Sequence, residues 1–224
     1  MIGVICLFGF NVFFFLGLKF SPAINGALIV SLTPALTLLY SNRILKTKLH
    51  LREIIGVLFS FLGVLYLMLK GNFSNLVDLT FSWGDLLLFT SSNFFAVQNV
   101  WVKSYGGKMS NLNFTLFTTL FCLLSFSLLM PFMSFGSIGS YSTNFWLATV
   151  GIGVFGTALA YILWNKGIDL KSANQAGVFI NVVPLSAAAF SLVFGEKLYA
   201  YHMISGIFII IGVMIIVIKR PLSS

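Results

Sequence analysis

Eight long apolar runs divide almost the whole chain, and they constrain its fold more than any other feature. They cover residues 1–18, 22–40, 53–69, 83–102, 112–133, 145–164, 173–194 and 200–218. Runs of about 20 residues match a helix that crosses a bilayer, whereas a transmembrane strand needs only about 9 to 11 alternating residues. Charged residues make up 8% of the chain, against about 25% in ordinary soluble domains. The sequence therefore predicts an all-α polytopic membrane protein, a bundle of about eight transmembrane helices.

The net charge of +8 comes from 13 basic against 5 acidic residues. The basic residues lie in short loops between the apolar runs, which favours a role in membrane topology over nucleic-acid binding. One side of the membrane receives Arg43, Lys46, Lys48, Arg52, Lys103, Lys108, Lys166, Lys171, Lys219 and Arg220, and the other receives Lys19, Lys70 and Lys197. Short basic loops stay inside the cell, so we expect a multi-pass cell-membrane protein with both termini and the 41–52 loop in the cytoplasm. A cleaved signal peptide is not expected, because no basic residue precedes the first apolar run.

The chain contains an internal repeat at a shift of 150 positions, which aligns residues 17–23 with 167–173. The same shift pairs Gly3 with Gly153, Pro34 with Pro184, Gly56 with Gly206 and Lys70 with Arg220. A shared turn, proline and glycine in one register indicate a true repeat rather than a chance match of apolar segments. The copy of a helix comes five spans later in the chain, an odd number, so the two copies cross the membrane in opposite directions. Inverted repeats of this kind are typical of transporters that bind substrate near the membrane midplane.

The two repeat units differ in length. The second unit begins near Trp83, and the same shift places the start of the first unit about 66 residues before Met1. Two helices of the first unit are therefore expected outside this sequence. We interpret Met1 as an internal start or as the start of a truncated gene model.

Three sequence features together resemble a known family. They are Trp83-Gly84-Asp85 at the start of the second unit, the turn and proline of 167–184, and the motif at 194–198 followed by Gly206 and Gly212. With these features the chain resembles an EamA-type member of the drug/metabolite transporter superfamily over essentially its whole length. The resemblance implies two five-helix repeats, with ten helices in the family pattern. Residues 1–72 would be the C-terminal part of the first EamA repeat, with three helices, and residues 82–219 the second repeat, with five.

Prolines and small residues mark where the helices bend or pack. Pro34 and Pro184 lie inside apolar runs and cannot donate a hydrogen bond to the carbonyls of Val30 and Ile180. They are predicted as hinges, with a static kink as the alternative. Close helix packing is predicted at Gly56, Ser60, Gly63, Gly151, Gly153, Gly156, Gly206 and Gly212.

Polar side chains inside the apolar runs are the candidates for a binding site, because they need partners or a wet cavity in the bilayer. The residues predicted to bind substrate are Asn11, Thr33, Asn93, Gln98, Tyr161, Asn174 and Asn181. Asn174 and Asn181 share a helix face because they are seven residues apart. Asn11 and Tyr161 are repeat equivalents. For any single residue, a hydrogen bond between helices fits as well as substrate contact.

Charged groups, cysteines and motifs give no sign of catalysis. The acidic residues lie near the ends of the runs, and Glu196 beside Lys197 is either an interfacial charge or a gating residue. Cys6 and Cys122 lie in apolar runs without metal-ligand spacing and are expected to pack. No metalloprotease, hydrolase or paired-carboxylate motif occurs. We expect no enzyme activity, no metal and no cofactor.

A polar but uncharged site with aromatic neighbours suits a neutral or zwitterionic small metabolite. The sequence thus predicts an exporter of compounds such as amino acids that works by alternating access, with uptake as the near alternative. A non-transporting membrane scaffold or a truncated inactive subunit is the alternative from another class. Expected partners are the lipid bilayer, the small-molecule substrate and a second copy in a homodimer, and nucleic acid is not expected.

Overall fold

The computed structural model describes residues 3–77, 79–105, 108–132, 139, 141–194, 197 and 199–218, and this part of the chain contains helices but no strand. The α-helices are α1 (Gly9–Phe20), α2 (Ala23–Val30), α3 (Thr33–Ile44), α4 (Leu51–Met68), α5 (Trp83–Tyr105), α6 (Asn111–Leu129), α7 (Thr143–Gly151), α8 (Ala160–Leu170), α9 (Ala173–Gly177), α10 (Val182–Ser191) and α11 (Ala200–Val217). Two π-helical segments, Gly3–Phe8 and Ile152–Leu159, lead into α1 and α8. Short 3-10 turns lie at Phe73–Leu76, Met130–Phe132, Val178–Asn181 and Leu192–Phe194.

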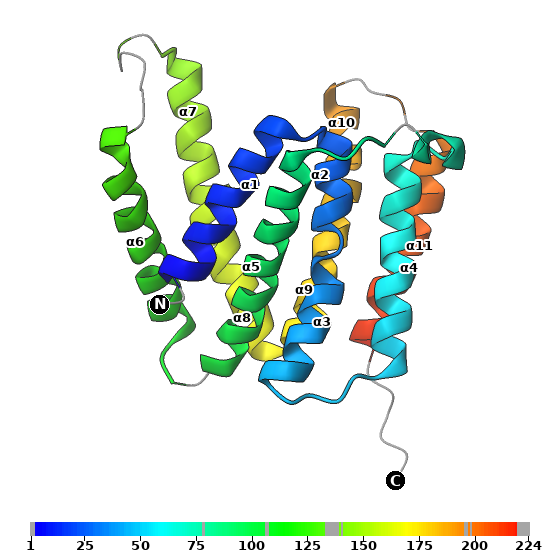
Figure 1. Cartoon of the computed structure of the whole chain (residues 1–224), viewed down its shortest axis with the longest axis horizontal. Coiled ribbons are helices and arrows are strands. Elements are labelled where there is room, and N and C mark those ends of the chain that lie inside the picture. The colour runs from blue at the N-terminus through cyan, green and yellow to red at the C-terminus, as the bar shows by residue number, and fades with distance from the viewer. Residues whose placement is uncertain are drawn as a thin grey trace.

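These elements form eight nearly continuous helical passes that follow the predicted apolar runs, with α8 reaching six residues further than expected. Six passes are long and apolar enough to cross a membrane. The segment Ile5–Phe20 is apolar but shorter, and α5 is long but carries several polar residues. The passes stand side by side and alternate in direction (Figure 1). The prediction of a helical membrane bundle is therefore confirmed.

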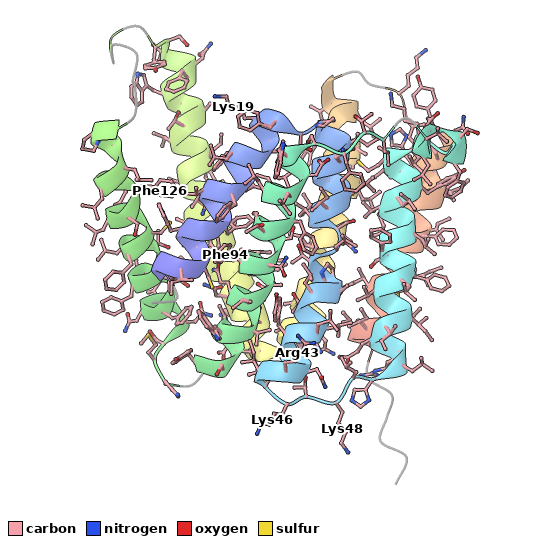
Figure 2. The ribbon with its side chains drawn as sticks, in the orientation of Figure 1. Lys19, Arg43, Lys46, Lys48, Phe94 and Phe126 are labelled. Carbon is pink, nitrogen blue, oxygen red and sulfur yellow. The ribbon has the colours of Figure 1, made fainter. Side chains whose placement is uncertain are left out.

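The loop that joins α3 to α4 and the C-terminal end of α11 lie at one edge of the bundle (Figure 1). Arg43, Lys46 and Lys48 project at this edge, and Lys19 lies near the opposite edge (Figure 2). The predicted separation of the basic residues into two groups is thus reproduced for these four. The edge that holds the α3–α4 loop is called the basic edge below.

The repeat is visible in local geometry as well as in sequence. The two π-helical segments fall at nearly equivalent positions of the 150-residue shift, and so do α4 and α11. Pro34 lies in the first turn of α3, after the break at Ser31 and Leu32, and Pro184 lies in the first turn of α10, after a 3-10 turn. Each predicted bend is therefore an interruption, with the proline opening a new helix, where its missing N–H costs least.

The most extensive helix pair joins the repeat-related helices α4 and α11. Small residues permit this approach: a Cβ on Gly212 would lie 2.5 Å from the carbonyl oxygen of Gly56 and 2.5 Å from the backbone nitrogen of Ser60. A Cβ on Gly63 would lie 2.9 Å from the carbonyl oxygen of Ser205. Close packing was predicted at these glycines and is confirmed.

The expectation of close packing at Gly151 and Gly153 is wrong. A Cβ on either glycine would meet nothing within 4 Å, because α7 and the π-helical segment after it contact few other elements. None of residues 143–164 is buried. The composition of a helix shows that it can be approached closely, but not that a neighbour does so.

Candidate functional site

A cavity of about 310 Å³ lies where the passes converge. It is lined by Phe10 of α1, Val30 of α2, Thr33 of α3, Ser92 and Phe95 of α5, Gly156, Ala160, Tyr161 and Trp164 of the α8 pass, Ile180, and Val183 of α10. Its volume falls at the lower end of the range for small-molecule pockets. We call it the central cavity.

The central cavity is built from repeat-related residues of both units. Phe10 and Ala160 are 150 positions apart, as are Val30 and Ile180, and Thr33 and Val183. Val30 and Ile180 are also the residues whose carbonyls lose a donor because prolines follow four positions later. The cavity therefore lies at the junction of the two inverted repeats, the position at which such folds bind substrate.

Three hydroxyl groups and an aromatic cluster give the cavity its chemistry. Thr33 is 1% exposed, and its Oγ1 has no hydrogen-bond partner in the part of the chain that the structure describes. Ser92 and Tyr161 supply the other hydroxyls. The rings of Phe10 and Phe95 lie 4.9 Å apart, and those of Phe95 and Trp164 lie 5.7 Å apart. No lining residue carries a charge.

One polar contact fixes the wall of the cavity. Trp164 Nε1 donates to Oδ1 of Asn99 at 2.9 Å, which joins α8 to α5. Asn99 is 1% exposed, and its Nδ2 has no partner among the described residues. The buried amide of Asn99 therefore lies close to the cavity wall, because its partner Trp164 lines the cavity.

A second cavity of about 340 Å³ adjoins the central one, because both are lined by Val30, Ile180 and Val183. Its other lining residues include Leu18 at the end of α1, Met68 at the end of α4, and Pro184. These helix ends lie at the edge opposite the basic edge (Figure 1). The second cavity thus extends from beside the central cavity toward the edge opposite the basic edge.

Toward the basic edge, buried side chains of the described helices pack against one another. Val100 and Val102 of α5, Phe114 of α6, Ile168 of α8 and Ala173 of α9 form one buried apolar cluster. Trp164 packs against this cluster and also lines the central cavity. The cluster therefore closes the cavity on the side of the basic edge.

Comparison with known proteins supports the same architecture. The model of the EamA-like transporter family matches residues 1–69 and 82–218, nearly the whole chain. The chain belongs to the EamA-like transporter family. It is therefore a multi-pass membrane protein, and the resemblance seen in the sequence is confirmed.

Several curated EamA-like relatives are similar over most of this chain. The uncharacterized transporter YyaM of Bacillus subtilis is 31% identical over 96% of this chain and 70% of its own length. YetK of the same organism is 27% identical over 96% of this chain and 66% of its own length. An uncharacterized transporter of Archaeoglobus fulgidus is 24% identical over 98% of this chain and 76% of its own length. The chain thus spans about two thirds to three quarters of the length of these relatives.

A solved structure with a TM-score of 0.81 covers 96% of this chain and 74% of its own chain, at 22% identity. At this identity the likeness concerns the fold alone. It supports the helical architecture of the EamA-like chain described above.

Two of the seven predicted substrate-binding residues line the central cavity, Thr33 and Tyr161. Asn11 lies beside them: its side chain interacts with the hydroxyl of Tyr161, its repeat equivalent. Asn11 also donates to the carbonyl oxygen of Leu7 at 2.7 Å. The structure thus brings these three predicted residues together.

The predicted residues of α5 lie elsewhere on that helix. Asn93 accepts a hydrogen bond from the hydroxyl of Tyr40 at 2.6 Å and donates to the carbonyl oxygen of Phe89. Gln98 is 2% exposed, and its Oε1 has no partner in the described part of the chain. Neither residue lines the central cavity.

Asn174 and Asn181 face the same neighbour, as their spacing predicted, and that neighbour is α4. Asn174 Nδ2 donates to Oε1 of Glu53 at 3.1 Å, and Asn181 Nδ2 donates to Oγ of Ser60 at 2.9 Å. Both residues are buried and lie outside the lining of the central cavity. The sequence offered interhelical bonding as the alternative for these asparagines, and the structure shows such bonds.

The predicted gating residue Glu196 lies outside the described residues. The residues that sequence analysis missed are Ser92 and the aromatic wall of Phe10, Phe95 and Trp164. Sequence analysis did not single out Ser92, because Thr90, Ser91 and Asn93 beside it are also polar. Aromatic side chains occur throughout this chain, so only the fold shows which of them line a cavity.

Proposed function

We propose that this chain transports a small, uncharged or zwitterionic metabolite through the central cavity. The observation that carries the proposal is the position of the cavity between the two inverted repeats, lined by three repeat-related pairs of residues. The names of the curated relatives, uncharacterized transporters, agree with this activity.

The lining supports the class of substrate. A charged molecule would need an opposite charge in a site inside the bilayer, and the cavity offers hydroxyl groups and aromatic rings instead. An amino acid with an apolar or aromatic side chain fits this chemistry. Its apolar part would pack on Phe95 and Trp164, and its polar groups would bond the hydroxyls of Thr33 and Tyr161.

Alternating access is the mechanism that we propose for this movement. A second cavity adjoins the central cavity toward the edge opposite the basic edge, and an apolar cluster packs on the side of the basic edge. Pro34 and Pro184 open α3 and α10 next to the cavity, where interrupted helices can change their angle. With the basic edge in the cytoplasm, this arrangement is the outward-facing state of the cycle, through which both export and uptake pass. Export is the direction we propose, and uptake is the alternative that the transport assay distinguishes.

The test is transport and binding by the full chain in proteoliposomes, with a panel of labelled amino acids and neutral metabolites. Binding is followed by quenching of tryptophan fluorescence, because Trp164 lines the cavity. We expect one substrate class to give saturable uptake and quenching, and Trp164→Phe to remove the quenching. Folded protein that neither moves nor binds any member of the panel would favour the second candidate, a non-transporting subunit.

A further inference from the structure

A groove of about 570 Å³ follows the outer seam between α4 and α11, next to the basic edge. It faces outward, because its lining residues Leu51, Met214 and Ile218 are 71%, 50% and 58% exposed. It shares no lining residue with the central cavity. We call it the seam groove. Its lining consists of Leu51, Arg52 and Ile55 of α4, and Ile211, Met214, Ile215 and Ile218 of α11 and its C-terminal end.

Close packing of the two helices creates the seam groove. A Cβ on Gly56 would lie 2.6 Å from the carbonyl oxygen of Gly212, so the backbones nearly touch and the larger side chains beside these glycines form the walls of a valley. Further along the seam, the rings of Phe59 and Phe208 stack 5.9 Å apart and do not line the groove. The groove thus extends along residues 211–218 of α11, about 10 Å of helix. One leaflet has about 15 Å of hydrocarbon, so the groove suits an acyl chain from a single leaflet.

Arg52 supplies the charge of the seam groove, at its end next to the basic edge. Its Nη1 donates to the carbonyl oxygen of Ile218 at 3.3 Å, which links the start of α4 to the end of α11. Ile218 is its sole hydrogen-bond partner in the part of the chain that the structure describes. A guanidinium has five N–H donors. Arg52 is therefore held at the groove and keeps donors for an anionic group.

The chain segments at this end of the groove are strongly basic. Arg43, Lys46 and Lys48 project at the same edge (Figure 2), and residues 41–52 contain no acidic residue. The next residue, Glu53, is 8% exposed and accepts a hydrogen bond from Asn174 of α9, so its carboxylate is buried inside the bundle and does not line the groove. The positive charge is thus uncompensated at the mouth, and its complement is an anion attached to an apolar chain.

We propose that the seam groove binds one anionic phospholipid of the cytoplasmic leaflet. The phosphate accepts charge-assisted hydrogen bonds from Arg52, and one acyl chain lies along α11 between Ile55 and Ile211. With the basic edge in the cytoplasm, the groove meets the leaflet whose surface carries the anionic lipids. The bound lipid bridges α4 and α11 at the point where the hydrogen bond of Arg52 to Ile218 joins them.

A second copy of the chain fits this groove less well than a lipid does. Two copies in one membrane have the same topology, so a two-fold axis between them runs along the membrane normal. Such an axis through the seam would set Arg52 and the basic 41–52 segment of one copy beside those of the other. Like charges that face each other across an interface are unfavourable, whereas a phosphate neutralises them.

The test titrates the full chain in detergent with dioleoyl phosphatidylglycerol and with dioleoyl phosphatidylcholine, which share their acyl chains and differ in headgroup charge. Native mass spectrometry counts the bound lipids. We expect the first phosphatidylglycerol to bind about fivefold more tightly than the first phosphatidylcholine, the factor that one basic residue contributes at an anionic surface. Arg52→Gln should abolish this preference. Arg52→Lys should keep part of it, because the charge remains and the guanidinium geometry is lost.

Two further variants separate the site from the general charge of the basic edge. Lys48→Gln removes the same charge from the same segment but lies outside the groove lining, so the preference should persist. Met214→Trp fills the apolar part of the groove and should weaken binding of the first phosphatidylglycerol while Arg52 is present. Gel filtration confirms the folded state of each variant before the titration.

Equal binding of the two lipids by the wild-type chain would overturn the proposal. So would an equal loss of preference in Lys48→Gln and Arg52→Gln, which would show diffuse attraction to the basic edge. Unchanged lipid binding in Met214→Trp would place the lipid elsewhere. A dimer that forms without lipid and is disrupted by Met214→Trp would make the seam groove a homodimer interface instead.

Discussion

The side chain of Asn181 donates a hydrogen bond to Oγ of Ser60 at 2.9 Å, and both residues are fully buried. Seven residues earlier in each pass, Asn174 donates to Glu53. The face shared by the two asparagines thus holds the second repeat against α4. This arrangement favours an interhelical role for Asn181 over a substrate-binding role.

We expect Asn181→Leu to leave substrate affinity within about twofold of wild type, because the amide lies outside the cavity lining. Interhelical hydrogen bonds in membranes contribute about 0.6 kcal/mol on average. A double-mutant cycle with Ser60→Ala should give a coupling energy of that order in an unfolding titration. A folded Asn181→Leu protein with a large loss of affinity would place Asn181 in the substrate site.

Thr33→Val should weaken substrate binding, because it removes a buried hydroxyl without a partner among the described residues from the cavity wall and keeps the shape of the side chain. Losing such a bond costs about 1 to 3 kcal/mol, or roughly five- to a hundredfold in affinity. The matched control is Thr37→Val, one turn later, whose hydroxyl donates to the carbonyl oxygen of Thr33. Equal affinities of the two variants would remove Thr33 from the site.

Pro184→Ala should lower the rate of transport more than the yield of folded protein. Alanine returns an N–H donor to the first turn of α10 and favours one continuous helix across the break after Asn181. Pro184 also lines the cavity next to the central one. Transport rate per folded molecule is the measurement, and a parallel fall in rate and yield would make the proline a structural residue only.

Gly212→Leu should destabilise the protein by at least the roughly 1 to 3 kcal/mol that overpacking typically costs. Its new side chain would meet backbone atoms of Gly56 and Ser60 at 2.5 Å, which cannot move aside as a flexible side chain can. Gly151→Leu is the control, since nothing lies within 4 Å of its Cβ position. Melting temperatures of the two variants in one detergent provide the comparison, and similar values would contradict the close contact between α4 and α11.

The basic edge should face the cytoplasm, because positively charged short loops remain inside. A cysteine at Asn42 should then resist an impermeant thiol reagent in intact cells and react after lysis. A cysteine at Ser74, an exposed residue in the 3-10 turn that follows α4, should react in intact cells. Labelling of the Asn42 position without lysis would reverse the topology.

The sequence by itself determined the membrane class, the eight passes, the inverted repeat and the family. These properties depend on the length of apolar runs, on the spacing of prolines and glycines, and on the charges of loops, all of which are local or periodic. Thr33 and Tyr161 were found for the same reason, since a hydroxyl inside an apolar run signals either a cavity or a hydrogen bond between helices. The sequence could not choose between those two outcomes.

Only the tertiary structure decided which polar groups already have partners. It joined Asn174 to Glu53 and Asn181 to Ser60, while leaving the hydroxyl of Thr33 at the cavity. It also showed that Gly17 is covered by α5 and that its copy Gly167 lies in an open groove. The physical reason is that burial and hydrogen bonding depend on neighbours from other helices, and the same residue in two copies of a repeat can meet different neighbours.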